Sequence, residues 1–506
     1  MIESITYKTR SDSSYLYSIN SGSNYFIHPL INYFFEEDNN NIGEKSYHVF
    51  FNNNNTRIIV DEVSYDSEEF EYYYSKYLYM RNNRIFETLL KDPNRYNGII
   101  SPKTIEKELA NLQSLVFEIT EKCNLNCLYC GYGVLYNNSE DRKRRVLSFD
   151  KVKLLFEYLQ PYWDDHPFSN SISQVINIGF YGGEPLLYFD LIEQIVVFIQ
   201  NLNMKSKSFI FRMTTNGVLL DRYIDKLINY NFHISVSIDG NETNHSYRIY
   251  KNGKNSFIDV YENLKRIQSS YPDYFANNVE LISVIHDRNS MHSVHEFLYS
   301  EFTKITSAFP LNTSGINKTK LKQFNQMFNN INNEIISNDI LKERFIGVPK
   351  VRLLTDYLVY NSSLFFKTYR DLFIKERESV RIPTGTCIPF SKKIFLSAGG
   401  KILACEKIGH EFELGQVTEK QVVLNIDKVC QKFNTYISSI RPSCNNCYFS
   451  EMCLQCIYQL EKTGNSNFIC KVRDKSEFSK YLSSVFSTIE ENPELVGRIY
   501  DEIVIH

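Results

Sequence analysis

The chain has 506 residues, and its 56 Lys and Arg against 59 Asp and Glu give a formal net charge of −3. This balance provides no general electrostatic attraction for nucleic acid or an anionic membrane. No apolar run reaches the ~18 residues that span a bilayer, and the first residues lack a secretory signal pattern. We therefore expect a cytoplasmic protein, whose eleven cysteines are not disulfide-bonded because the cytosol keeps thiols reduced.

Residues 1–108 are expected to form a separate α+β module. Residues 14–19 alternate like a half-buried strand, residues 56–60 form a second β-like run, and residues 68–90 form a tyrosine-rich helical pattern. Pro29 suits the first turn of a helix that covers residues 28–35. Two interpretations are open: the module captures a peptide, for example by strand addition, or it is an extension that shields the next domain.

Residues 109–315 alternate between strand and helix patterns, as in a parallel α/β sheet. Helical patterns lie between the strands, at 149–159, 189–202, 219–230, 257–269 and 293–302. The chemistry of such folds is found at the carboxyl ends of the strands. Six strands are expected, at 115–120, 175–181, 209–215, 233–238, 279–285 and 306–311.

Cys123, Cys127 and Cys130 follow the first of these strands with the spacing Cys-x3-Cys-x2-Cys. A cubane iron–sulfur cluster normally takes four ligands, so three thiolates would leave one iron open for a substrate or cofactor. Zinc is the rival metal, but no fourth Cys or His lies nearby in the sequence. Three unrelated buried cysteines are the remaining alternative.

This segment, with Tyr129 before its last cysteine, resembles the cluster loop of radical S-adenosylmethionine (radical SAM) enzymes. Further segments match in order: Gly182-Gly-Glu-Pro, Met213-Thr-Thr-Asn-Gly and Ser235-Val-Ser-Ile-Asp-Gly. The resemblance implies a partial (β/α)6 TIM barrel within an α/β fold. It also implies that the amino and carboxylate groups of S-adenosylmethionine chelate the open iron. The reduced cluster then cleaves the cofactor to a 5′-deoxyadenosyl radical.

The cofactor-binding residues follow from the same resemblance. Two glycines let backbone approach a ligand closely, and the adjacent Glu184 offers a carboxylate to the cofactor's amino group. The planar fork of Arg248 suits the cofactor's carboxylate. Asp239 is expected to orient the loop or to bind substrate; read alone, a polar residue at a strand end usually caps a helix. The full set implied is Tyr129, Gly182, Gly183, Glu184, Asn216, Ser237, Arg248 and Ile285, with Ile285 against adenine.

Residues 316–380 are expected to form a helical bridge, 381–475 a cysteine-rich domain and 476–506 a helical tail. The cysteine-rich part resembles the SPASM extension, which carries two auxiliary clusters. Residues 397–403 are expected to form a hairpin that turns at Gly399-Gly400 and brings Cys387 and Cys405 together. The resemblance assigns Cys387, Cys405 and Cys456 to the first auxiliary cluster, and Cys444, Cys447, Cys453 and Cys470 to the second.

The cysteine-rich part departs from the family pattern in one place. Cys453-x2-Cys456 is one residue shorter than the family spacing. The first cluster then lacks an evident fourth ligand, which is either a distant residue such as Cys430 or the thiolate of a substrate. Zinc is the alternative metal, because paired Cys-x2-Cys units are common in zinc ribbons. Glu406 directly follows Cys405; some relatives have a proton-accepting acid here, and the alternative is a solvated partner of Lys407.

The sequence as a whole indicates a radical SAM enzyme that modifies a ribosomally synthesised precursor peptide with a leader. We expect a thioether or another cross-link. The implied cofactors are S-adenosylmethionine and three [4Fe-4S] clusters, and the implied electron donor is a flavodoxin or ferredoxin. Nucleic acid and membrane are not expected as partners. Two alternatives are a sulfatase-maturating enzyme that forms formylglycine, and a non-catalytic iron–sulfur scaffold or electron carrier.

Overall fold

The structure is a computed structural model. It describes residues 4–18, 22–40, 48–52, 55–60, 62–83, 85–86, 94–137, 144–164, 167–169, 174–202, 204, 207–304, 306–313, 315–329, 349–360, 362, 380–463 and 467–502.

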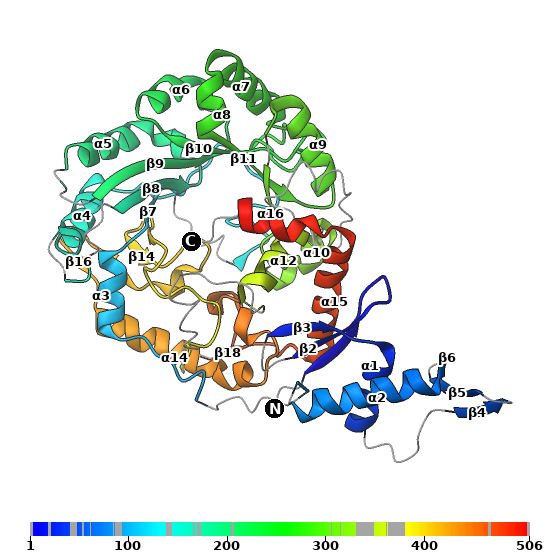
Figure 1. The fold of residues 1–506 in the computed structure, drawn as a ribbon. Helices are drawn as coiled ribbons and strands as arrows, with labels where there is room; N and C mark the ends of the chain where they lie inside the picture. Colours follow the sequence, from blue (N-terminus) through cyan, green and yellow to red (C-terminus); the bar gives the residue numbers. More distant parts are fainter. Residues whose placement is uncertain are drawn as a thin grey trace.

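A curved sheet of six parallel strands lies at the centre, with helices along its outer side (Figure 1). The six predicted strands and the five helices expected between them are confirmed, so the fold is the α/β partial barrel. The short helix α8 (Pro272–Asn278) was not predicted, although Pro272 is a helix-start signal. The strands are β7 (Ser114–Thr120), β8 (Gln174–Gly182), β9 (Lys207–Thr215), β10 (His233–Ser237), β11 (Val279–Ile285) and β12 (Thr306–Pro310); the helices are α4 (Phe149–Asp164), α5 (Phe189–Gln200), α6 (Leu220–Asn229), α7 (Phe257–Ser270) and α9 (Met291–Phe302).

The core between strands and helices is rich in aromatic side chains. The ring of Phe117 on β7 lies 6.3 Å from that of Phe156 on α4. Trp163, the only tryptophan of the chain, is fully buried, and its Nε1 donates a hydrogen bond to the Leu109 carbonyl at 3.1 Å. Leu109 belongs to α3 (Pro102–Ala110), which packs on α4 and on α14 (Ile426–Asn445). Trp163 is therefore a core residue that links α4 to α3.

Four strands from the cysteine-rich part continue the barrel sheet beyond β7. β13 (Ile394–Leu396) pairs in parallel with β7, and β14 (Lys401–Leu403), β15 (Gly415–Val417) and β16 (Val422–Val423) follow antiparallel. The predicted hairpin over 397–403 is confirmed: the Gly400 N–H donates to the Ser397 carbonyl at 2.8 Å, and Gly400 has φ +89°. The sequence did not indicate that this hairpin joins the barrel sheet.

The N-terminal part consists of two three-stranded antiparallel sheets, each followed by a helix. The second sheet and α2 project away from the barrel (Figure 1). The tyrosine-rich helix predicted over 68–90 ends at Asn82, and residues 87–93 lie outside the described residues. The elements are β1 (Ile5–Lys8), β2 (Ser14–Ser18), β3 (Ser23–Phe26), α1 (Pro29–Asn40), β4 (His48–Asn52), β5 (Asn55–Val60), β6 (Val63–Asp66) and α2 (Ser67–Asn82).

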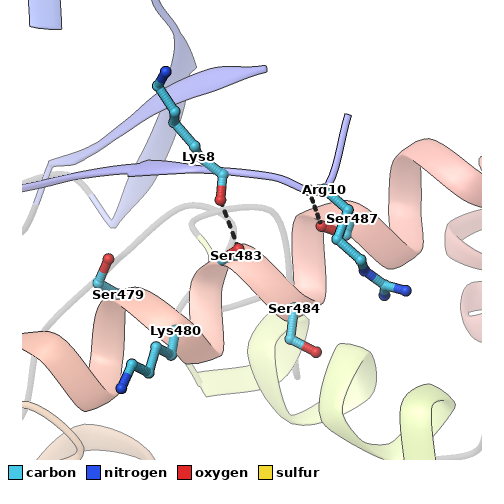
Figure 2. A pocket seen from close by; sticks show the side chains of 7 residues that line it. All are labelled: Lys8, Arg10, Ser479, Lys480, Ser483, Ser484 and Ser487. Carbon is cyan, nitrogen blue, oxygen red and sulfur yellow. Dashed lines mark hydrogen bonds between the residues drawn. The ribbon is translucent and has the colours of Figure 1, made fainter. Parts of the chain in front are cut away.

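The strand β1 docks on α15 (Lys475–Glu491), close to the end of the chain. The Ser483 hydroxyl donates to the Lys8 carbonyl at 2.6 Å, and the Arg10 N–H donates to the Ser487 hydroxyl oxygen at 2.9 Å (Figure 2). A pocket of about 440 Å³ opens beside these contacts, with Lys480 among its lining residues. Helix α15 therefore satisfies backbone groups along β1, whereas β3 pairs only with β2 among the described strands.

Helices also occur where the bridge and the tail were predicted. α10 (Leu321–Met327) and α12 (Pro349–Tyr360) lie within residues 316–380, and residues 330–348 are outside the described part. α15 is followed by α16 (Glu494–Glu502), and both contact α12. The hairpin β17 (Glu461–Thr463) and β18 (Asn467–Ile469) lies against α14.

Candidate iron–sulfur and S-adenosylmethionine site

The three-cysteine loop begins directly after β7, at the carboxyl end of the first barrel strand. Its three thiols are half-buried, and Cys127 interacts electrostatically with both Cys123 and Cys130. The Cys123 sulfur accepts hydrogen bonds from the Leu125 N–H at 3.4 Å and from Asn216 Nδ2 at 3.7 Å. The predicted loop therefore brings all three cysteines together. Burial raises the pKa of Cys123 to about 11, and the two hydrogen bonds to its sulfur act in the opposite direction.

The backbone of the loop is held by the segment that follows β10. The Asn126 N–H donates to the Ile249 carbonyl at 2.7 Å, and the Leu128 N–H donates to the Tyr247 carbonyl at 3.0 Å. These bonds make the loop an extra strand-like layer on residues 247–249. Its position is thus set by the β10 end of the barrel as well as by β7.

Gly182 and Gly183 allow the chain after β8 to pass close to the start of the loop. Gly182 has φ +133°, and a Cβ on Gly183 would lie 2.0 Å from the Lys122 carbonyl oxygen. The Glu184 N–H donates to that same oxygen at 2.9 Å. The close approach that these glycines permit is to the loop's own backbone, where the sequence predicted an approach to a ligand.

Glu184 places a fully buried carboxylate beside the loop. It accepts hydrogen bonds from the Leu186 N–H at 3.1 Å, the Thr215 hydroxyl at 2.8 Å and the Asn216 N–H at 2.8 Å. Burial raises its pKa to about 7, although the three hydrogen bonds act in the opposite direction. All three of these donors are neutral. The positive charge of a ligand ammonium group would therefore stabilise the ionised form of this buried carboxylate.

Asn216 and Ser237 lie at neighbouring strand ends, as predicted. Asn216 Nδ2 donates to Asn124 Oδ1 at 2.8 Å and its Oδ1 accepts from the Val218 N–H at 3.1 Å, so the side chain links β9 to the cluster loop. Ser237 is buried in the last position of β10. Ile285 ends β11 and is fully buried in the main hydrophobic core.

Arg248 is buried and forms a two-point ion pair with Asp239, which follows β10. Its Nε and Nη2 lie 2.9 and 3.1 Å from the two carboxylate oxygens. This pair holds the Asp239 pKa well below its usual range, overcoming the opposing effect of burial. A cofactor carboxylate would therefore have to use the remaining N–H groups of Nη1 and Nη2 of Arg248 or displace Asp239. The Arg248 guanidinium also lies 5.4 Å from the ring centre of Tyr129.

Three further residues at this end of the barrel were not predicted from the sequence. His286 Nε2 lies 3.9 Å from Asp239 Oδ2. His245 Nδ1 accepts from the Asp239 N–H at 3.3 Å, and burial lowers its pKa to about 3, which keeps it neutral. Asn289 Nδ2 donates to the Asp239 carbonyl at 3.2 Å. The only signal in the sequence was their place shortly after predicted strands.

Four cysteines of the C-terminal part form one group. Cys444, on α14, interacts electrostatically with the other three, and its sulfur accepts a hydrogen bond from the Thr384 N–H. Gly385 packs so tightly on the Cys453 backbone that a Cβ would lie 1.8 Å from its carbonyl oxygen. The grouping matches the set that the resemblance assigned to one auxiliary cluster: Cys444, Cys447, Cys453 and Cys470.

The other assigned set is only partly assembled. Cys456 interacts electrostatically with Cys387, and its sulfur accepts hydrogen bonds from the Thr386 side chain and from the Tyr458 N–H. Among the interactions found in the described residues, none joins Cys405 to Cys387. Cys430 is buried in the main hydrophobic core, and the charged group acting on it is Asp427. The structure therefore gives Cys430 no contact that would make it the fourth ligand.

The sulfur environments suit metal-bound thiolates at three of the cysteines that the resemblance assigned to clusters. Cys123, Cys405 and Cys456 share a turn in which the N–H two residues later donates to the sulfur. Such bonds favour the thiolate that ligates metal. No three Cys, His, Asp or Glu side chains in the described part converge on a point that would suit one ion. In a cubane cluster each thiolate binds a different iron, so the cysteines that hold it lie farther apart than the ligands of a single ion.

Glu406 lies with Lys393 near the opposite end of β7. Lys393 Nζ contacts its two carboxylate oxygens at 3.1 and 3.0 Å, and the Cys405 sulfur lies 3.4 Å from Oε2. Burial alone would raise the pKa of Glu406, but Lys393 outweighs it and the pKa is lowered. Glu406 is thus an ionised, largely buried carboxylate beside a predicted cluster ligand, and its partner is Lys393 where the sequence analysis had suggested Lys407.

A parallel barrel with three cysteines after its first strand and a buried carboxylate after its second is the arrangement that the resemblance to radical SAM enzymes implied. Residues 117–298 match the family model of the Radical SAM superfamily, so this part of the chain is a Radical SAM domain, and the match supports a radical SAM enzyme. The superfamily uses S-adenosylmethionine and a [4Fe-4S] cluster.

Two relatives extend the similarity beyond this domain. A cysteine-type anaerobic sulfatase-maturating enzyme of Clostridium novyi is 23% identical over 403 residues, which cover 74% of this chain and 97% of that protein. The radical SAM cyclopropyl synthase TigE of Paramaledivibacter caminithermalis is 21% identical over 457 residues, 85% of this chain and 88% of that protein. These relatives confirm the resemblance to radical SAM maturases.

A third relative and one solved structure are also similar. An uncharacterised protein of Methanocaldococcus jannaschii is 28% identical over 276 residues, 52% of this chain and 84% of that protein. The solved structure of polyhistidine-tagged anSMEcpe with bound AdoMet aligns over 78% of this chain and 96% of its own, at 17% identity and a TM-score of 0.49. Separately, no helix in the described part of the chain is long and apolar enough to cross a membrane.

Proposed function

We propose that this radical SAM enzyme matures a ribosomally synthesised peptide, which it binds inside the barrel between two iron–sulfur sites. The observation that carries the proposal is the placement of Cys123 and Cys405 at opposite ends of β7. Leu396 of β13 pairs with Phe117, and β14 then returns toward the start of β7. Since β7 has seven residues, the two sites are separated by a strand of ~20 Å.

The carboxyl ends of the strands seat the cofactor in this proposal. Glu184 binds the amino group of S-adenosylmethionine, because a buried carboxylate with neutral donors is stabilised by an added cation. Arg248 faces the cofactor's carboxylate. Cys123, Cys127 and Cys130 hold the [4Fe-4S] cluster. When bound, the cluster and S-adenosylmethionine supply the radical that removes a hydrogen atom from the substrate.

Glu406, near the start of β7, acts as the residue that accepts a proton from the substrate. Its ion pair with Lys393 keeps it ionised at neutral pH. Cys405 beside it belongs to an auxiliary cluster, to which the four-cysteine group adds a second. A cluster held at either site would accept one electron from the substrate. The external electron donor to the enzyme is a flavodoxin or ferredoxin.

The outer edge of β3 is where we place the leader of the peptide. The Ile27 N–H bonds to the Ser14 carbonyl at 2.9 Å, so by antiparallel alternation Asn24 and Phe26 direct their backbone groups outward. The Phe26 side chain is 71% exposed beside this edge. An extended peptide added there would form main-chain hydrogen bonds along β3.

The decisive experiment is anaerobic incubation of the reconstituted protein with reductant, S-adenosylmethionine and a candidate precursor peptide. We expect 5′-deoxyadenosine and a peptide that has lost two hydrogens, as in a thioether or another cross-link. Cys127→Ala is the control that should give neither product. Production of 5′-deoxyadenosine at the control level would favour the non-catalytic scaffold instead.

Formylglycine formation is the second candidate, and it is favoured by the similarity to the sulfatase-maturating enzyme of Clostridium novyi. A synthetic peptide with a sulfatase-type cysteine would test it. Conversion of cysteine to formylglycine replaces sulfur by oxygen in addition to removing two hydrogens. The mass change therefore distinguishes the two candidate reactions in one measurement.

A further inference from the structure

The carboxylate of Asp239 accepts hydrogen bonds from three residues at the carboxyl end of the barrel. Oδ2 accepts from the Tyr129 hydroxyl and from Arg248 Nε at 2.9 Å. Oδ1 accepts from Arg248 Nη2 at 3.1 Å and from the Val284 N–H at 2.9 Å. Asp239 is fully buried, and the ring of His286 packs against Tyr129 at 5.6 Å.

This bonding leaves little capacity for a substrate. An ionised carboxylate has about four acceptor positions, and four protein donors already occupy them. Of the two roles that the sequence left open for Asp239, the structure favours orientation of the loop. The residue it orients is Tyr129, which lies between Cys127 and Cys130 in the cluster loop.

Asp239 also balances the charge of Arg248 beside one cluster ligand. Both groups act on the Cys127 sulfur with opposite sign. The neighbouring His245 is neutral because burial lowers its pKa to about 3, so it adds no charge to the Asp239–Arg248 pair. Charges interact strongly in a buried site, because little water screens them.

We propose that Asp239 is a positioning residue that fixes the Cys127–Cys130 half of the loop through Tyr129 and, by neutralising Arg248, sets the reduction potential of the bound cluster. The inference rests on the cluster assignment made under the proposed function. It adds a specific division of roles: the Tyr129 hydroxyl holds the loop, and the Asp239 charge sets the potential.

The test uses the full-length protein, reconstituted anaerobically, as wild type and as the Asp239→Asn and Tyr129→Phe variants. Two properties are measured: the midpoint potential of the cluster whose electron paramagnetic resonance signal is lost in Cys127→Ala, and the rate at which a chelator removes iron. Asp287→Asn is the matched control. Asp287 also accepts from a tyrosine, the Tyr247 hydroxyl at 2.9 Å, and it does not appear among the groups that act on Cys127.

We expect Asp239→Asn to shift the midpoint potential upward, since the uncompensated Arg248 then favours the reduced, more negative cluster. Tyr129→Phe retains both charges, so it should keep the wild-type potential and release iron faster. Asp287→Asn should match the wild type in both measurements. In the double variant Asp239→Asn/Arg248→Gln the potential should return toward the wild-type value, because both charges are removed.

An unchanged potential in Asp239→Asn overturns the electrostatic role, and a wild-type iron-release rate in Tyr129→Phe overturns the positioning role. If Asp239→Asn does not fold, Arg248→Gln tests the electrostatic role instead: loss of the cation should lower the midpoint potential, and an unchanged potential would overturn that role. Wild-type protein that takes up no iron would instead overturn the proposed function, so the two failures are distinguishable.

Discussion

The Glu184 carboxylate, after β8, accepts the backbone N–H of Asn216, after β9, at 2.8 Å. The same Asn216 donates from its side chain to Asn124 of the cluster loop at 2.8 Å. The proposed amino-group site and the proposed cluster site are thus joined through one residue. In the proposed function, this link would hold a ligand at Glu184 in register with the cluster on the three-cysteine loop.

Replacing the carboxylate of Glu184 should weaken cofactor binding. Glu184→Gln keeps the shape of the side chain but removes the charge opposite the cofactor's ammonium group, and a charge-assisted hydrogen bond contributes about 1.5–3 kcal/mol. We expect the Kd for S-adenosylmethionine to rise about 10- to 100-fold, measured by calorimetry on the reconstituted protein. Glu193→Gln is the control, because Glu193 pairs with Lys226 at 2.9 Å on the outer helices. Equal affinities in both variants would remove Glu184 from the cofactor site.

Binding of S-adenosylmethionine should also depend on pH near neutrality. Burial raises the pKa of Glu184 to about 7 in the ligand-free protein, and only the ionised form pairs with an ammonium group. Affinity should therefore increase as pH rises through about 7 and level off above it; well below, it should fall about tenfold per unit. The pKa of Glu184 is higher in the folded protein than in the unfolded chain. Its contribution to the free energy of unfolding is therefore complete below the unfolded-state pKa and is lost as the pH rises to about 7. Titrations at several pH values, repeated with Glu184→Gln, should show a flat profile in the variant.

Glu406→Gln should separate the two halves of the reaction. The cofactor site lies at the other end of β7, so 5′-deoxyadenosine should still form at a rate close to that of the wild type. Modified peptide should decrease about 10²- to 10⁴-fold, the usual contribution of a general base. Chromatography and mass spectrometry of the same samples quantify both products. Glu411→Gln is the matched control on an exposed carboxylate, and parallel loss of both products would place Glu406 outside substrate chemistry.

The edge of β3 can be tested with a proline. Phe26→Pro removes an outward N–H and leaves the ladder to β2 intact, so it should weaken binding of a precursor leader at least about tenfold. Phe26→Ala is the companion variant, because it removes the exposed ring and keeps the N–H. Fluorescence anisotropy with a labelled leader measures both affinities. Wild-type binding by Phe26→Pro would show that the leader does not add to this strand.

Trp163 offers a test of the core that is independent of the cofactors. Trp163→Ala empties a fully buried site and should lower the free energy of unfolding by about 3–5 kcal/mol. Trp163→Phe should cost less, since it fills most of the space and loses mainly the hydrogen bond to Leu109. Circular dichroism during denaturant unfolding measures both losses. Val197→Ala, on the exposed side of α5, should stay close to the wild type.

The barrel was predictable from the sequence because its strands and helices have strong local periodicity. The strands at 115–120 and 279–285 match β7 and β11 within one residue. The cysteine loop and Glu184 were found because each belongs to a contiguous motif. The structure brings these predicted residues together at one end of the barrel; their roles in binding stay predictions.

What the sequence could not provide was the pairing of distant segments. Asp239 follows β10, whereas Tyr129 lies in the loop after β7 and Val284 lies in β11. No local pattern indicates that the Asp239 carboxylate accepts hydrogen bonds from both of these residues. The parallel pairing of β13 with β7 joins residues about 280 positions apart and was missed for the same reason. Arg248 was expected to face a cofactor carboxylate, and its pairing with Asp239 depends on contacts that only the folded chain defines.

The pairing of β13 with β7 has a consequence for any attempt to divide the protein. Because the hairpin Ile394–Leu403 covers the hydrogen-bonding edge of the first barrel strand, a truncated barrel that ends before it would expose that edge to other chains. Such a fragment should aggregate, and the barrel and the cysteine-rich part should melt as a single cooperative unit.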